Sequence, residues 1–219
     1  MLCLLAMVRL LSYIYPITKN VKSEFNGTLE ITWYNGKKYL NSKNANYSYG
    51  SLQKILKIGL EKIDLDKCNE ILLLGLGGGS VIKTLRNDYK YRKNITALEI
   101  DPIIIQLAND EFNIRKSENL HIICEDAHTF MKHNTKKFNL IILDLYIDVE
   151  VPSSFLEFPF WKNILRASKQ SILFNASLDT NTNDKISCII SLLKKNSYHV
   201  EKLEKVNETN TLVIATIKN

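Results

Sequence analysis

Residues 71–79 read Ile-Leu-Leu-Leu-Gly-Leu-Gly-Gly-Gly, an apolar run that stops at a cluster of glycines. Four aliphatic side chains in a row predict a strand that is buried on both faces, as in a parallel sheet. Glycines directly after such a strand permit a tight turn and let backbone N–H groups approach a ligand. A helical pattern follows at Val81, Ile82 and Leu85, and Ser80 stands where it could cap that helix. The stretch therefore predicts a nucleotide-like ligand at the end of this strand.

The size and charge of the chain limit the classes of protein to consider. Its 219 residues suit one α/β domain with a small appendage. The chain has 29 basic and 23 acidic residues, and its lysines are spread along polar segments. Because no arginine-rich stripe or interleaved aromatic platform is present, we expect a solvated surface and no specific binding of nucleic acid.

The four cysteines, Cys3, Cys68, Cys124 and Cys188, form no Cys-x-x-Cys pair. Their scatter favours buried free thiols in a reducing compartment over disulfides or zinc, so we expect a cytoplasmic location. Residues 1–8 are apolar, but Arg9 interrupts them well short of the length of a membrane span. We therefore expect no signal peptide and no membrane association, with Met1 and Met7 as alternative starts.

The N-terminal segment, residues 1–45, is expected to carry a β-hairpin appendage. Apolar and polar side chains alternate over residues 28–33, and Asn35-Gly36 is a typical two-residue hairpin turn before residues 37–40. The remainder, residues 46–219, is expected to form a nucleotide-binding α/β domain.

Strands and helices alternate regularly along this second domain. Alternation of this length predicts a doubly wound, mostly parallel sheet with helices on both faces. A polar turn at residues 207–210 joins the last two strands, and this hairpin-like end favours an antiparallel edge strand. The seven expected strands are 71–74, 95–100, 120–123, 138–143, 171–175, 199–205 and 211–218. The expected helices are 49–63, 80–88, 102–111, 127–132, 155–167 and 183–195.

The four strands that begin at residues 71, 95, 120 and 138 each end in glycines or a carboxylate, at the edge where such sheets bind ligands. Glu99 lies 24 residues after Gly75, a spacing that suits a carboxylate bound to ribose hydroxyls. Asp126 and Asp144 follow the next two strands. Singly, each acid has an equally good structural explanation, because Asp126 and Asp101 can cap helices and Asp144 can occupy a turn. Jointly, an acid at every strand end favours a ligand site.

These motifs together resemble a known family. Leu-Gly-Leu-Gly-Gly-Gly, Leu-Glu-Ile-Asp-Pro, Glu-Asp-Ala and Phe-Asn-Leu-Ile-Ile-Leu-Asp are similar to the motifs of the class I S-adenosylmethionine-dependent fold, and within it to the spermidine synthase-like proteins. The resemblance runs from about residue 24 to the end. It implies that the glycines hold the tail of S-adenosylmethionine or its decarboxylated form, that Glu99 holds the ribose, that Asp126 and Ala127 border the adenine, and that Asp144 lies beside the sulfonium. It also implies a homodimer. The implied cofactor-binding set is Gly75, Gly77, Gly78, Gly79, Glu99, Ile100, Asp126, Ala127 and Asp144.

The chain departs from this family at positions that bear on the reaction. Aminopropyl transfer needs a deprotonated amine and a carboxylate that takes its proton. The family usually has an aspartate where this chain has Gly78, and a second acid where it has Ile147. Its Tyr-His-Glu segment is reduced here to Tyr49-Gly50-Ser51. Asp148, one residue beyond Ile147, and Glu150, two further on, are alternatives for the second acid. The expected catalytic residues are Asp144 and Asp148.

Several kinds of function stay open from the sequence. One is transfer of an aminopropyl group to a small amine, and another is transfer of a methyl group to a different acceptor. A third is a cofactor-binding homologue without catalysis, which Gly78 and Ile147 motivate. A nicotinamide dehydrogenase shares the glycine turn and the ribose acid, but it leaves Asp126 and Asp144 without roles.

Aromatic and histidine residues give weaker signals. Tyr47, Tyr49 and Trp33 are candidates for a substrate slot, although such residues more often pack in a core or at a domain joint. An aromatic group after Asp144 either forms a lid or packs the next helix onto the sheet, and the burial habits of aromatic residues favour packing. That group is Phe155, Phe158, Phe160 and Trp161. We expect no metal: His121 lies in a strand, and His128 and His133 are five residues apart where a helical pair of ligands would be four apart.

Overall fold

The N-terminal part of the chain forms a helix and a small antiparallel sheet. The computed structural model describes residues 2–42, 51–146, 150–177, 183–208 and 210–217. Helix α1 (Leu2–Leu11) precedes strands β1 (Ile17–Ser23), β2 (Gly27–Tyr34) and β3 (Lys37–Asn41), which pair in the order β1-β2-β3. The predicted hairpin is confirmed as β2–β3, whereas β1 and α1 were not predicted. The predicted domain boundary at residue 45 lies outside the described residues. No described helix has the length and apolar character that a membrane span requires.

The second sheet contains seven strands in the order β6-β5-β4-β7-β8-β10-β9. Pairing is parallel from β6 through β8, and β10 is antiparallel to both of its neighbours. The mostly parallel seven-stranded sheet is therefore confirmed. Its strands are β4 (Glu70–Leu74), β5 (Asn94–Glu99), β6 (Leu120–Cys124), β7 (Phe138–Leu143), β8 (Ser168–Ser177), β9 (Tyr198–Val206) and β10 (Asn210–Ile217).

One detail of the predicted topology was wrong. The antiparallel strand is not at the edge: β10 inserts between β8 and β9, and the edge strand β9 runs in the direction of the parallel strands. The reason is burial. The apolar strand β10 is almost fully buried, whereas β9 carries exposed charged residues and suits an edge.

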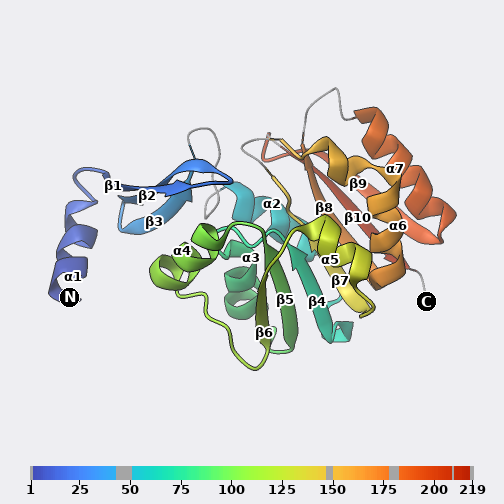
Figure 1. The fold of residues 1–219 in the computed structure, drawn as a ribbon, viewed down its shortest axis with the longest axis horizontal. Coiled ribbons are helices and arrows are strands. Elements are labelled where there is room, and N and C mark those ends of the chain that lie inside the picture. Colours follow the sequence, from blue (N-terminus) through green and yellow to red (C-terminus); the bar gives the residue numbers. More distant parts are fainter. Residues whose placement is uncertain (1, 43–50, 147–149, 178–182, 209, 218–219) are drawn as a thin grey trace.

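Helices cover both faces of the sheet (Figure 1). They are α2 (Ser51–Leu60), α3 (Ser80–Lys83), α4 (Pro102–Phe112), α5 (Ala127–His133), α6 (Phe158–Ala167) and α7 (Asn183–Lys195), with short helical turns at Leu65–Lys67, Thr84–Asp88 and Ser153–Leu156. Side chains of β4 alternate between the two resulting cores. Ile71 and Leu73 join one cluster, and Leu72 and Leu74 join the other. All four are fully buried, so the predicted doubly buried strand is confirmed.

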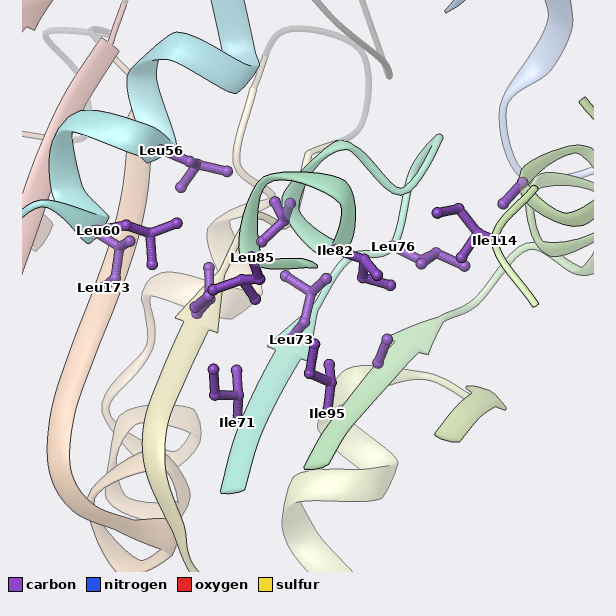
Figure 2. Packing of buried hydrophobic residues seen from close by; sticks show 14 of the residues in the cluster. Leu56, Leu60, Ile71, Leu73, Leu76, Ile82, Leu85, Ile95, Ile114 and Leu173 are labelled. Atoms are coloured by element: carbon purple, nitrogen blue, oxygen red, sulfur yellow. The ribbon is translucent and has the colours of Figure 1, made fainter. Parts of the chain in front are cut away.

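The first core lies under α2, α3 and α4. Figure 2 shows Leu73 and Ile95 of the sheet close to Ile82 and Leu85 of the helical segment after the glycine turn. This packing holds the glycine turn in place, because the helical segment that follows the turn cannot move without disrupting the first core. The second core lies under α5, α6 and α7 and contains the fully buried Trp161. The centroid of its ring lies 5.3 Å from that of Phe174.

The thiols are only partly as predicted. Cys68 is buried, and its burial raises the pKa of the thiol to about 11. Cys124 and Cys188 are exposed, so the prediction of buried thiols was wrong for these two. Both are free cysteines, as is Cys68.

Of the three helix caps considered from the sequence, one was wrong and two are confirmed. Ser80 does not cap α3: its predecessor Gly79 is the N-cap, in a left-handed conformation, and Ser80 is buried as the first helical residue. Asp101 and Asp126 cap α4 and α5 through bonds to the backbone N–H groups of Ile103 and Thr129, both at 2.9 Å. Both acids are therefore helix caps, as their positions in the sequence suggested.

Asp101 also joins the two sheets of the molecule. It is fully buried, and its Oδ2 accepts hydrogen bonds from the Ser23 hydroxyl and, at 2.7 Å, from the Asn26 amide. Ser23 ends β1 and Asn26 lies in the turn before β2. One carboxylate thus caps α4 and anchors the three-stranded sheet to the second domain.

Replacing Asp101 with alanine is expected to lower the free energy of unfolding by about 3 kcal/mol, because it leaves two half-buried donors without this acceptor and removes a cap. Asp126→Ala is the matched control, since it removes a cap that is not fully buried and is expected to cost about 1 kcal/mol. Urea denaturation measures both. Equal losses in the two variants would contradict the anchoring role.

Candidate functional site

The carboxyl ends of β6, β5, β4 and β7 meet at one edge of the sheet and bring the predicted site residues together. Leu74 pairs with Leu98 on one side and with Leu143 on the other. Beyond these pairs, Gly75 N donates to Leu98 O at 3.1 Å and Asp144 N donates to Leu74 O at 2.9 Å. The glycine turn, Glu99 and Asp144 therefore follow three adjacent strands, and Asp126 follows the fourth.

The glycine turn has a backbone that favours glycine. Gly75, Gly77 and Gly79 have φ values of 95°, 50° and 77°. A Cβ atom on Gly75 would overlap the backbone carbonyl oxygen of Asp144, and one on Gly79 would overlap the side chain of Ile114. The turn therefore lies close against the next strand end and presents backbone rather than side chains. Gly78 is buried in the middle of the turn.

Glu99 holds the glycine turn from the neighbouring strand. Its Oε2 accepts from Gly77 N at 3.1 Å and its Oε1 accepts from Asp101 N at 3.2 Å. Burial raises the pKa of Glu99 above its usual value, and the hydrogen bonds from Asp101 and Gly77 oppose that rise. The carboxylate thus lies at the strand end and is fixed by backbone donors. Ile100, next in the chain, is 41 % exposed beside it.

Asp126 and Ala127 start the helix after β6. Asp126 is half-buried, its Oδ1 is engaged by the backbone and hydroxyl of Thr129, and Ala127 is buried in the second core. The next residue, His128, stacks on Phe155 with ring centroids 4.6 Å apart and planes 14° apart. This stack ties the start of α5 to the segment that follows β7.

The aromatic group after Asp144 mainly packs, as predicted. Phe160 and Trp161 are buried in the second core and Phe155 packs against it. Phe158 differs, because it is 61 % exposed at the start of α6.

Asp144 begins a chain of polar side chains that sequence reasoning missed. Its Oδ1 accepts from the amide of Asn175 at 2.9 Å, Asn175 Oδ1 accepts from Asn210 at 2.9 Å, and Asn210 also donates to the Tyr146 hydroxyl at 2.9 Å. Burial raises the pKa of Asp144 to about 6, and the hydrogen bond from Asn175 counteracts part of the rise. Burial, and then the charge of Asp144, raise the pKa of Tyr146.

The signal for this network was an asparagine inside an apolar strand. Asn175 is fully buried in β8 between Phe174 and Ala176. A buried amide needs partners, and its partners are Asp144 and Asn210. Asn210 comes from β10, 35 residues further along the chain, so only the inserted position of β10 brings it here.

Other candidate residues lie elsewhere. Asp148, Tyr47 and Tyr49 fall outside the described residues, and Glu150 is exposed. Trp33 lies in β2, half-buried at the joint between the small sheet and α4. In the part of the chain that the structure describes, no three histidine, cysteine or acidic side chains gather as metal ligands would.

This sheet order, with helices on both faces and a glycine turn after β4, defines a class I methyltransferase-like fold. A family model described as the spermine/spermidine synthase domain matches residues 53–211. This chain therefore belongs to the spermine/spermidine synthase domain family.

One curated protein and two solved structures are similar to this chain at low identity. A polyamine aminopropyltransferase of Sulfurisphaera tokodaii is 28 % identical over 144 residues, which are 60 % of this chain and 46 % of the relative. The chain thus spans about half the length of that relative. A probable spermidine synthase from Corynebacterium glutamicum is 15 % identical, with a TM-score of 0.65 over 92 % of this chain and 77 % of that one. Human methyltransferase-like protein 13 is 20 % identical, with a TM-score of 0.62 over 78 % of this chain and 83 % of that one. The last two comparisons support the fold.

Proposed function

We propose that this chain is a transferase that moves an alkyl group from an adenosyl sulfonium donor to an amine, with aminopropyl transfer as the leading reaction. The donor is S-adenosylmethionine or its decarboxylated form. The observation that carries the proposal is Asp144, a half-buried carboxylate at the same sheet edge as the glycine turn and Glu99. The family membership of the chain supports the proposal.

The residues at the sheet edge fit the donor. The glycine turn carries only the Leu76 side chain among its five residues and packs closely against Asp144 and Ile114, and Glu99 places its carboxylate beside the turn. We assign the donor tail to the turn from Gly75 to Gly79, the ribose to Glu99 and Ile100, and the adenine to Asp126 and Ala127. The bound donor supplies a carbon made electrophilic by the attached sulfonium.

Asp144 suits the acceptor end of such a site. Transfer to an amine forms a C–N bond and breaks a C–S bond, and the amine gives up a proton. A carboxylate with a pKa of about 6 is ionised at neutral pH, attracts a cationic group and accepts a proton more readily than an ordinary aspartate. The hydrogen bond from Asn175 fixes its position.

Methyl transfer is the second candidate, and Gly78 favours it. Aminopropyl transfer uses a donor whose free end is a cationic amine, and a carboxylate near the turn would pair with it. Gly78 has no carboxylate to offer, so the turn lacks a partner for that amine. The human structural neighbour is a methyltransferase-like protein in complex with S-adenosylhomocysteine.

The nucleoside product separates the two reactions. Purified protein is incubated with each form of the donor and 1,4-diaminobutane, and the products are resolved by mass spectrometry. Release of 5′-methylthioadenosine together with an aminopropylated amine supports aminopropyl transfer. S-adenosylhomocysteine released from intact S-adenosylmethionine supports methyl transfer. Calorimetric binding of both donors without any product, across a panel of amine acceptors, would contradict the transferase and support a non-catalytic homologue.

A further inference from the structure

A cavity lies where the small sheet meets the helices of the first core. It has a volume of about 650 Å³ and is lined by residues from α1, β2, β3, α2, α3 and α4 and from the β2–β3 turn. Figure 1 shows the small sheet beside α4 at one end of the molecule. None of the residues that we assign to the donor lines this cavity. Its size is typical of sites for small organic ligands.

The wall of the cavity is strongly basic. Five of its side chains are cationic and one, Glu111, is acidic. Glu111 forms an ion pair with Lys38, in which Lys38 Nζ lies 2.7 Å from Glu111 Oε2. Arg9, Lys37 and Lys54 are exposed and form no ion pair with any residue that the structure describes. Because cations on a concave wall reinforce one another's potential, the cavity favours an anion with more than one charge.

The wall also carries aromatic rings. Trp33 and Tyr39 are half-buried and line the cavity, so part of each ring stays accessible. Lys38 Nζ lies 4.9 Å from the centroid of the Trp33 ring. Deeper in the wall, Lys83 Nζ lies 5.3 Å from the centroid of the buried Phe112 ring. Aromatic rings next to cations suit a ligand that combines a flat ring with negative charge.

We infer that this cavity binds a nucleoside phosphate, with its base against Trp33 or Tyr39 and its phosphates among Arg9, Lys37 and Lys54. A simple inorganic polyanion would use the cations but leave the rings without a role, and an uncharged nucleoside would leave the cations unpaired. The inference is independent of the proposed transferase, because it uses none of the same residues.

Trp33 provides a direct readout of binding. The chain has two tryptophans, and Trp161 is fully buried in the second core. ADP is titrated while tryptophan fluorescence is followed, once without S-adenosylhomocysteine and once with it at a concentration that occupies the proposed donor site. We expect a saturable change in fluorescence that is absent in Trp33→Phe. Adenosine is expected to bind at least tenfold more weakly than ADP, and pyrophosphate to compete with ADP.

Charge reversal separates a built site from general attraction. Lys37→Glu combined with Lys54→Glu is expected to weaken ADP binding at least tenfold. The matched control combines Lys162→Glu with Lys194→Glu, two exposed lysines of α6 and α7 on the other face of the sheet, and is expected to change it less than twofold. The inference is overturned if ADP gives no saturable change, if both double variants lose binding equally, or if S-adenosylhomocysteine abolishes the signal.

Discussion

Asp144→Asn is expected to lower the rate of transfer by about 100-fold or more and, at the same time, to stabilise the unliganded protein at neutral pH. The loss of rate follows from the loss of the carboxylate that attracts the cationic substrate and takes up a proton. The gain in stability follows from burial, because the folded protein holds this carboxylate where ionisation is unfavourable.

The sign of the effect on stability follows from the two pKa values of Asp144. In the folded protein its pKa is raised from 3.8 to about 6, so the folded state binds the proton more tightly than the unfolded state. Its contribution to stability is therefore fully present below about pH 4 and is lost as the pH rises through 6. At pH 8 the buried charge costs up to about 3 kcal/mol, and asparagine removes that cost.

Denaturation of both proteins between pH 4 and pH 8 measures this effect. We expect the difference in free energy of unfolding to grow with pH and to vanish near pH 4, whereas Asp126→Asn, which keeps a good helix cap, changes little at any pH. The transfer rate of the unmodified protein is expected to fall below about pH 6, as Asp144 takes up its proton. A variant that is inactive and also destabilised at pH 8 would contradict this account of the carboxylate.

Gly75→Ala is expected to cause the largest loss of stability, at least about 3 kcal/mol. A left-handed residue other than glycine already costs about 1 kcal/mol, and here the new Cβ would also overlap the backbone carbonyl oxygen of Asp144. That backbone belongs to the end of a central strand, which cannot move without disturbing both cores.

Gly27→Ala is the matched control for this prediction. Gly27 also has a positive φ, 63°, but a Cβ there would meet nothing within 4 Å. Gly27→Ala is expected to lower the free energy of unfolding by about 1 kcal/mol, which is the cost of the left-handed backbone conformation alone. Thermal or urea unfolding of the two variants separates the cost of the collision from that of the backbone angle. Equal losses would mean that the glycine turn is not packed against Asp144 as described.

Much of the fold could be predicted from the sequence because the strands of a parallel sheet are buried on both faces. The uninterrupted run at residues 71–74 supplies side chains to two cores at once, as expected of a central strand in a parallel sheet. The ends of β5, β6 and β7 were equally clear, since each apolar run stops at a charged residue. The N-terminal strand β1 was missed because it reads Ile-Thr-Lys-Asn-Val-Lys-Ser, in which only two apolar residues stand among polar ones.

The surroundings of Asp144 could not be predicted, because they depend on contacts between distant segments. Asn175 and Asn210 are ordinary residues in the sequence, and they meet only because β10 enters the sheet beside β8. Asp101 shows the same limit: its cap was visible in the sequence, but its bonds to Ser23 and Asn26 join residues more than 70 positions apart. The sequence pattern shows which strands end in acidic residues, and the order of strands in the sheet determines which side chains hydrogen-bond to those acids.

The glycine turn and the acids around it were assigned to one adenosyl-bearing donor, and a crystal structure of the protein with 5′-methylthioadenosine bound tests that assignment most directly. The account predicts that the ribose hydroxyls contact Glu99, that the adenine lies against Asp126 and Ala127, and that the sulfur points toward Asp144. A nucleoside bound elsewhere, such as in the basic cavity beside Trp33, with the glycine turn empty, would contradict the account.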